Sequence, residues 1–425
     1  AFAGCPTARY IAINGSAAEV KGNAFQGDKN ATLLIVGKQQ MTDFTDYTGI
    51  NDAATGSVDT KVFRICYLKD IEQGRLLKRY AANNTTAAIG STGSYANTSD
   101  LYAYSFDSNN DGKADYLHVA GASAMETTWA DKTQVPWNEI RETLTKVCVE
   151  DDVTSVGPYA FEDCTALTFA RIGKGAATFS THAFYNCSSL KEFLCNVRSF
   201  STGSLTADSN VFVNAGASDG FSVVFEDDAT RIPGYLFYNC KNLTNLTLGK
   251  GISSINSFAF AGCTGMKTLY IKSTKIDSTD PKIFTDAGKE SGGFTVELAA
   301  NVTKVPDNLF YSTDGNPYVT SVFADAGSKL ESIGSSAFFD CNRLESAYFA
   351  NCTMLTYIHN AAFKGCTRLV SADFSNCVKL QKINSEAFAN CMNLADFTIS
   401  NDKAITNIGD KAFYNTLAIR TMTIP

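Results

Sequence analysis

The sequence predicts a β-rich solenoid, a fold in which one short structural unit is stacked many times along an axis. The pattern Ala-Phe-x-x-Cys-x-x-Leu recurs along most of the 425 residues, for example at Val153–Leu167, Leu330–Leu344 and Leu355–Leu369. The repeat phenylalanines are 23 to 28 residues apart. A fixed period of this length is typical of solenoids, because one such unit buries its apolar face only against a neighbour. The repeat phenylalanines are Phe161, Phe184, Phe212, Phe237, Phe260, Phe284, Phe310, Phe338, Phe363, Phe388 and Phe413.

Two extended segments are expected in each unit. A short Val/Ile-x-x-Ile/Val run precedes the phenylalanine, and an alternating segment such as Leu243–Leu248 follows the cysteine and reads as the main strand. Stacked units then form a parallel sheet with strands about 4.8 Å apart. A glycine or asparagine often follows the first segment, and we expect it to adopt a left-handed turn conformation. These residues are Gly157, Gly234, Asn256, Gly334, Asn384 and Gly409.

The repeat divides the chain into three regions. Residues 1–40 hold N-terminal repeat units of a truncated array, because the chain opens directly with Ala-Phe-Ala-Gly-Cys. Residues 41–151 lack the repeat and form an intervening region that includes a β-hairpin. Residues 152–425 are the main array of about eleven turns. Longer insertions follow Phe184, Phe284 and Phe310, and are either ligand-facing loops or drift at tolerant surface positions.

The thirteen cysteines are interpreted mainly as packing residues. Most follow the repeat phenylalanine by three residues, and other copies place Ala or Thr in that slot. A slot shared by these residues requires a small, buried side chain, and a free cysteine packs as a small hydrophobe. We therefore expect a ladder of buried thiols rather than a disulfide framework. The ladder in the main array comprises Cys164, Cys187, Cys240, Cys263, Cys341, Cys366 and Cys391.

The overall charge disfavours some partners. The net charge is −7 and the isoelectric point about 5.2, so bulk attraction to nucleic acid is not expected. No apolar segment is long enough to predict insertion into a membrane.

One segment resembles a calcium loop. Asp107, Asn109, Asp111 and Asp115 place oxygen-bearing side chains at relative positions 1, 3, 5 and 9, with a glycine at position 6. The acidic residue expected at position 12 is replaced by His118. The alternative is a β-hairpin whose tip is Asp111-Gly112, and a hairpin and a bound calcium ion are compatible.

Aromatic residues at variable strand positions are candidates for a binding face. Phe193, Tyr270, Tyr348 and Phe374 are expected to line the exposed side of the sheet. Aromatic rings on a rigid surface suit recognition of proteins or carbohydrates. The alternative is that these rings pack against adjacent turns.

The sequence contains no recognisable catalytic or cofactor motif. The three histidines, His118, His182 and His359, show no motif spacing, and no HExxH, GxSxG, P-loop or dinucleotide fingerprint occurs. No enzymatic activity and no cofactor other than calcium are therefore predicted.

The repeat resembles that of the BspA-like leucine-rich-repeat family, from about Val153 to Pro425 and again over residues 1–40. The resemblance implies a leucine-rich-repeat right-handed superhelix. The segment from Tyr104 to Gly157 is also similar to regions that precede such arrays. By that resemblance Pro136–Thr145 forms a helix or turn, with Trp137, Ile140 and Leu144 facing the first repeat.

Members of this family occur mainly on the surfaces of host-associated bacteria and are associated with adhesion. The resemblance thus implies an extracellular, non-catalytic cell-surface protein that binds a protein or glycan of a host or neighbouring cell. Two alternatives stay open: a carbohydrate-capture protein, and a purely structural spacer.

Overall fold

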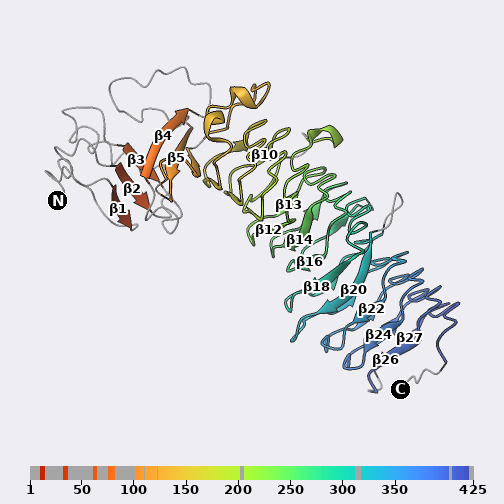
Figure 1. Cartoon of the computed structure of the whole chain (residues 1–425). Helices are drawn as coiled ribbons and strands as arrows, with labels where there is room; N and C mark the ends of the chain where they lie inside the picture. The colour runs from red at the N-terminus through yellow and green to blue at the C-terminus, as the bar shows by residue number, and fades with distance from the viewer. Residues whose placement is uncertain are drawn as a thin grey trace, which may run out of the picture.

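The computed structural model describes the backbone of four strands before residue 82, and residues 101–420 apart from 110, 122, 202–204, 281, 312–316 and 402–403. It confirms the parallel β-solenoid (Figure 1). The main array continues as one stack along the axis of the molecule.

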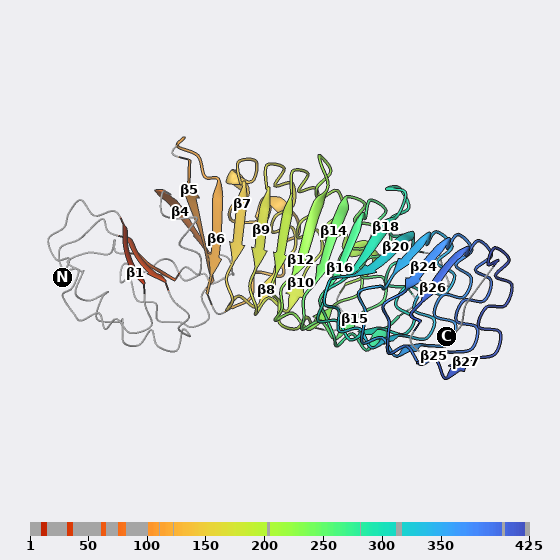
Figure 2. The ribbon, with the colours of Figure 1, turned by 90° about the horizontal axis from the view of Figure 1, so that it is seen from below.

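One sheet of fourteen strands runs along the array (Figure 2). From β7 to β26 its strands pair in parallel through ten successive steps, so the array has about ten turns. The strands are β4 (Arg75–Ala81), β5 (Tyr102–Asp107), β6 (Tyr116–Ala120), β7 (Lys146–Val149), β9 (Phe169–Ile172), β11 (Glu192–Cys195), β12 (Phe221–Phe225), β14 (Leu243–Leu248), β16 (Thr268–Ile271), β18 (Phe294–Leu298), β20 (Val319–Ala324), β22 (Ser346–Tyr348), β24 (Ser371–Phe374) and β26 (Asp396–Ile399).

The opposite side of most turns carries a two-residue strand, as the run before the phenylalanine predicts. These short strands form parallel sheets of two, three and five members. They are β8 (Ser155–Val156), β10 (Thr178–Phe179), β13 (Arg231–Ile232), β15 (Ser254–Ile255), β17 (Ser278–Thr279), β19 (Lys304–Val305), β21 (Ser332–Ile333), β23 (Tyr357–Ile358), β25 (Lys382–Ile383) and β27 (Asn407–Ile408).

The observed sheets do not follow the expected region boundaries. The N-terminal strands β1 (Tyr10–Asn14), β2 (Thr32–Val36) and β3 (Lys61–Arg64) form a separate parallel sheet, and β3 lies beyond residue 40. Strands β4 to β7 lie before residue 152, yet they belong to the main sheet. Strands β4, β5 and β6 are antiparallel, and β6 pairs in parallel with β7. Strands β4 to β7 thus continue the sheet of the array.

A column of phenylalanine rings forms the core of the array. The eleven repeat phenylalanines stack in order, with ring centroids 4.5 to 5.6 Å apart. The rings from Phe161 to Phe388 are at most 2% exposed. A buried aromatic ring removes a large apolar area from water, and offset stacking adds about 0.5–1.5 kcal/mol per pair. Each turn is therefore held mainly by its two neighbours.

Two left-handed residues flank most of the repeat phenylalanines. One lies two positions before the ring, as at Tyr235 (φ 61°), and the other two positions after it, as at Asn239 (φ 57°). The prediction that Gly157, Gly234, Asn256, Gly334, Asn384 and Gly409 hold this conformation was wrong, because none of them has a positive φ. At the glycine positions a neighbouring segment approaches closely instead. A Cβ on Gly409 would lie 2.4 Å from the backbone nitrogen of Ser385.

The predicted cysteine ladder is buried. All seven ladder cysteines are free thiols with no exposed area. Most of them donate their S–H to the carbonyl oxygen of the phenylalanine one turn earlier; for example, Cys366 Sγ lies 3.1 Å from Phe338 O, and Cys391 Sγ 3.1 Å from Phe363 O. The thiol thus fills a small space and satisfies a buried carbonyl group.

The segment before the array caps its first turn. The segment Pro136–Thr145, expected to be a helix or turn, contains the 3₁₀ turn η4 (Asn138–Ile140), and a further 3₁₀ turn, η3 (Lys132–Gln134), precedes it. Trp137 and Leu144 are fully buried, Ile140 packs against the core, and the Trp137 ring extends the phenylalanine column at 5.9 Å from Phe161. A third 3₁₀ turn, η5 (Ala207–Ser209), lies in the insertion after Phe184.

Side chains of the cap also replace missing backbone donors. Within the array, the N–H of Phe161 donates to Ala183 O, and the N–H of Asp163 donates to Tyr185 O. The equivalent carbonyl groups of the first turn belong to Ala160 and Glu162. Trp137 Nε1 donates to Ala160 O at 2.8 Å, and Arg141 Nη1 donates to Glu162 O. The cap therefore satisfies the two carbonyl groups that the first turn would leave unpaired.

The burial of the thiols predicts their reactivity. Burial raises the pKa of Cys164 and Cys195 to about 12, so neither forms a thiolate near neutral pH. We expect the native protein to expose at most two of its thirteen thiols to an aromatic disulfide reagent, since the eleven described cysteines are all buried. All thirteen should react in denaturant. Recovering fewer reactive thiols in denaturant would indicate disulfides and contradict the ladder.

The cap predicts a specific cost for Trp137→Phe. This change keeps an aromatic ring on the column but leaves Ala160 O without its donor, so we expect a loss of about 1–3 kcal/mol of unfolding free energy. Urea denaturation followed by circular dichroism measures it. The control is Glu142→Ala, at an exposed position of the same segment, which should change little. Equal effects of both changes would remove the capping role of the indole.

Candidate binding surface

The outward side chains of the main sheet form continuous columns. The strands from β14 to β26 lie side by side (Figure 2). Apart from one shift between Phe294 and Thr295 they pair in register, so residues at equivalent positions are neighbours. We call these side chains, with the residue that follows each strand, the outward face. Its central column is Thr247, Tyr270, Glu297, Phe323, Tyr348, Asp373 and Thr398. A parallel column of mostly hydroxyl residues is Asn245, Thr268, Thr295, Ser321, Ser346, Ser371 and Asp396.

Two of the four predicted face residues lie on the outward face. Tyr348 is 48% exposed and Tyr270 is half-buried. The prediction for Phe193 and Phe374 was wrong, because both are fully buried. Phe193 pairs in register with Ala170 and Val223, which point into the core, and its ring lies edge-on to Phe184. The alternative of packing against adjacent turns applies to these two.

The alternation of inward and outward side chains along each strand decides which aromatic residues are exposed. Tyr270 lies between the buried residues Leu269 and Ile271, so it must point outward. The same rule places Phe323 on the outward face between Val322 and Ala324. Phe323 was not among the predicted face residues, although the alternation of buried and outward residues in β20 was sufficient to find it.

A small polar cluster connects neighbouring columns of the outward face. Tyr270 Oη donates to Asp325 Oδ2 at 2.8 Å, a hydrogen bond between residues two turns apart. This bond raises the pKa of Tyr270. Partial burial, and then the charge of Asp325, raises the pKa of Glu297. Two carboxylates thus lie close together, which favours the approach of a positive charge.

Negative charge predominates on the outward face. Its strand columns and the positions directly after them carry four carboxylates, at Glu297, Asp325, Asp373 and Asp396, but one lysine, Lys272. Lys272 Nζ lies 5.7 Å from the centre of the Tyr270 ring. The surface therefore combines exposed aromatic area with an excess of acidic groups.

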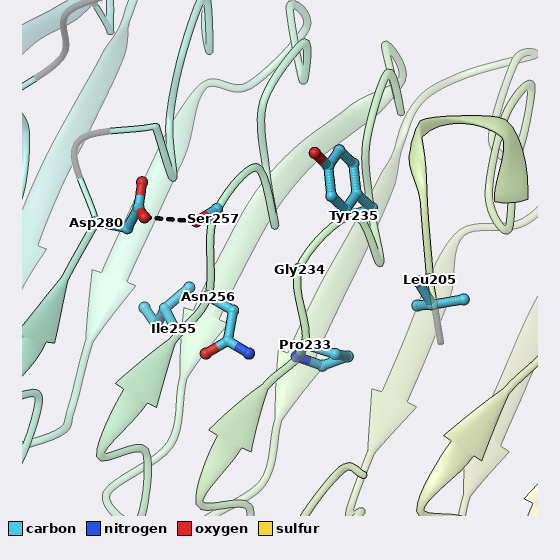
Figure 3. Close-up of a pocket in the computed structure, with 8 residues that line it drawn as sticks. All are labelled: Leu205, Pro233, Gly234, Tyr235, Ile255, Asn256, Ser257 and Asp280. Carbon is cyan, nitrogen blue, oxygen red and sulfur yellow. Dashed lines mark hydrogen bonds between the residues drawn. The ribbon is translucent and has the colours of Figure 1, made fainter. Parts of the chain in front are cut away.

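A separate hollow lies beside the short strands β13 and β15 (Figure 3). Its volume is about 310 Å³, and its lining residues are Leu205, Pro233, Gly234, Tyr235, Ile255, Asn256, Ser257 and Asp280. The Tyr235 ring stacks on Phe258 at 5.1 Å, and Ser257 Oγ donates to Asp280. Gly234 keeps the floor open, since a Cβ there would lie 2.6 Å from Ser257 O. The hollow offers an aromatic ring, an amide and a carboxylate together.

The expected calcium loop forms the tip of a hairpin between β5 and β6. Asp107 accepts the N–H groups of Asp111 and Gly112, and Asp115 accepts the N–H and Oγ–H of Ser108. Asp107 and Asp115 are buried, while Asn109 and Asp111 are exposed. The carboxylates therefore fix the turn, and a calcium site at this tip stays a prediction.

The fold and the open sheet face define a leucine-rich-repeat scaffold. The chain belongs to the family of BspA type leucine rich repeat regions: the family model matches six copies within residues 140–211, 206–320 and 317–425. These ranges cover about two thirds of the chain. They include the end of the cap and the whole array.

Three solved structures are similar to this chain. A leucine-rich repeat protein from Eubacterium ventriosum is 19% identical, covers 76% of this chain and 94% of its own, and has a TM-score of 0.32. One from Bacteroides ovatus is 16% identical over 72% of this chain and 88% of its own, with a TM-score of 0.27. A leucine rich cell surface protein from Faecalibacterium prausnitzii is 17% identical over 69% and 92%, with a TM-score of 0.21.

No curated protein matches the chain. Within the described residues, no helix has the length and apolar character that crossing a bilayer requires.

Proposed function

We propose that this protein is a non-catalytic, extracellular cell-surface protein that binds a protein partner through its outward face. The observation that carries the proposal is the column of Tyr270, Glu297, Phe323 and Tyr348 on a sheet whose other side is tightly packed. Exposed aromatic rings on a rigid element lose little conformational entropy on binding, and such rings dominate many protein interfaces. Membership of the BspA type family supports a surface role.

The charge of the outward face suggests the chemistry of the partner. The four carboxylates favour a segment rich in lysine or arginine, whose charged groups would approach Glu297 and Asp325 while its apolar stems cover the tyrosine rings. Such a complex depends partly on attraction between exposed charges, and its affinity should fall as salt rises.

The binding proposal predicts the effect of Tyr348→Ala. Screening on an array of secreted and matrix proteins should yield hits whose contact segments are basic. The substitution should weaken binding to such a hit at least about tenfold, because a central aromatic contact contributes about 1.4 kcal/mol or more. Surface plasmon resonance measures the affinity.

The control is Val378→Ala, which truncates an exposed apolar side chain outside the columns and should leave the affinity unchanged. Asp325→Asn should reduce both the affinity and its salt dependence. Equal affinity of wild type and Tyr348→Ala for every hit would overturn the proposed face. An array without hits would favour the structural spacer.

A carbohydrate ligand is the second candidate, and the hollow at Tyr235 favours it. Sugars bind by stacking an apolar face on an aromatic ring while their hydroxyl groups bond to amides and carboxylates, and the hollow groups Tyr235, Asn256 and Asp280. Its volume of about 310 Å³ is at the lower end for small-molecule sites.

Tyr235→Ala tests this candidate on a glycan array. The fold tolerates alanine at this left-handed position, because Ala361 occupies the same position in a later turn with φ 54°. We expect loss of glycan binding by Tyr235→Ala and full retention by Tyr414→Ala, which alters an exposed ring elsewhere. Glycan binding that survives Tyr235→Ala would exclude the hollow as its site.

A further inference from the structure

A histidine, a cysteine and a glutamate converge on one face of the sheet where the cap joins the array. His118 on β6 and Cys148 on β7 are direct register partners, and Glu150 lies two residues beyond Cys148 on the same face. They are 1%, 4% and 5% exposed, respectively. One ligand atom of each, the histidine nitrogen, the thiol sulfur and a carboxylate oxygen, lies within 4.8 Å of the other two.

The position of this cluster is unusual for the sheet. Side chains that point inward from the same strands, Leu117, Val119, Val147 and Val149, belong to the core of the array. The cluster lies on the other side, which in later turns carries exposed residues such as Tyr348. Burial of three groups that can carry charge is costly unless they hold a cation or pair among themselves.

The orientation of His118 points its second nitrogen at the cluster. Tyr116 Oη lies 3.1 Å from Nδ1 of His118. When Nδ1–H donates to that oxygen, Nε2 presents a lone pair toward the other two groups. An outer partner that fixes the tautomer in this way is typical of histidines that bind metals.

Nε2 and Glu150 are close but poorly aligned. Nε2 lies 2.9 Å from Glu150 Oε1, yet the contact lacks the geometry of a hydrogen bond. The nitrogen, sulfur and oxygen atoms of the three side chains thus surround one point, as the ligands of a bound cation do.

We propose that His118 Nε2, Cys148 Sγ and Glu150 bind one divalent transition-metal ion of the zinc type. Nitrogen, sulfur and carboxylate oxygen are the donor atoms that zinc takes, and three protein ligands leave a fourth position for water. Because the ligands come from β6 and β7, the ion joins the antiparallel cap strands to the first parallel strand. Binding displaces the protons of the thiol and the imidazole, so affinity rises with pH.

Cobalt(II) is the probe for this site. The full-length protein, stripped with a chelator, is titrated with cobalt and followed by absorption, since a cobalt–thiolate bond gives a charge-transfer band in the near ultraviolet. We expect one equivalent per chain, the thiolate band, and displacement by zinc. Zinc should raise the midpoint of thermal unfolding by about 2–4 °C. Cobalt uptake without the thiolate band is adventitious binding and overturns the proposal, as does the absence of uptake.

Matched variants locate the ion. Cys148→Ala should abolish the band and the stabilisation by zinc, whereas Cys195→Ala should retain both, because Cys195 is buried on a different strand and outside the cluster. A band that persists in folded Cys148→Ala contradicts the assignment. If Cys148→Ala does not fold, His118→Gln provides the second variant, and the wild-type titration alone still decides whether a thiolate binds the ion.

Discussion

The stacking of each turn's phenylalanine on the next is the interaction on which the rest of this structure depends. One turn of 23 to 28 residues is too small to bury a core alone, and the eleven stacked rings supply the apolar contact that every turn lacks. The other repeated features serve this column. The left-handed residues on either side of the ring bend the backbone around it, as at Tyr235 and Asn239, and the ladder thiols donate to its carbonyl groups.

The first turn has no preceding turn to pack against, and side chains of the cap supply the missing contacts. Trp137 acts both as a further ring of the column and as a donor to Ala160 O, and Arg141 donates to Glu162 O. The antiparallel strands β4 to β6 extend the sheet beyond β7, so the first parallel strand has no free edge on that side. The cap therefore lacks the sequence repeat but provides the same ring stacking, carbonyl hydrogen bonds and strand pairing that a preceding turn would provide.

The architecture and the buried ladder could be predicted from the sequence because they depend on spacing alone. The regular period predicts the solenoid, and a repeat position shared by Cys, Ala and Thr predicts that the side chain at this position is buried. The exposed face could not be predicted by aromatic content, since Phe193 and Phe374 point inward while Tyr270 and Tyr348 point outward. Contacts between turns of unequal length were beyond prediction, including the bond from Tyr270 to Asp325 and the convergence of His118 with Cys148. They depend on a register that insertions shift.

The two faces of the sheet are subject to different constraints, and this difference locates specific chemistry. Every inward position must match its neighbours above and below, so a change there disturbs three turns at once. Outward positions touch fewer partners and are free to carry Thr, Tyr, Glu or Asp, as the central column does between β14 and β26. Polar groups on that side are normally solvated. Where the cap joins the array they are buried instead, as His118 and Glu150 are. The same side of one sheet thus carries an open surface where no other segment covers it, and a buried polar cluster where the cap covers it.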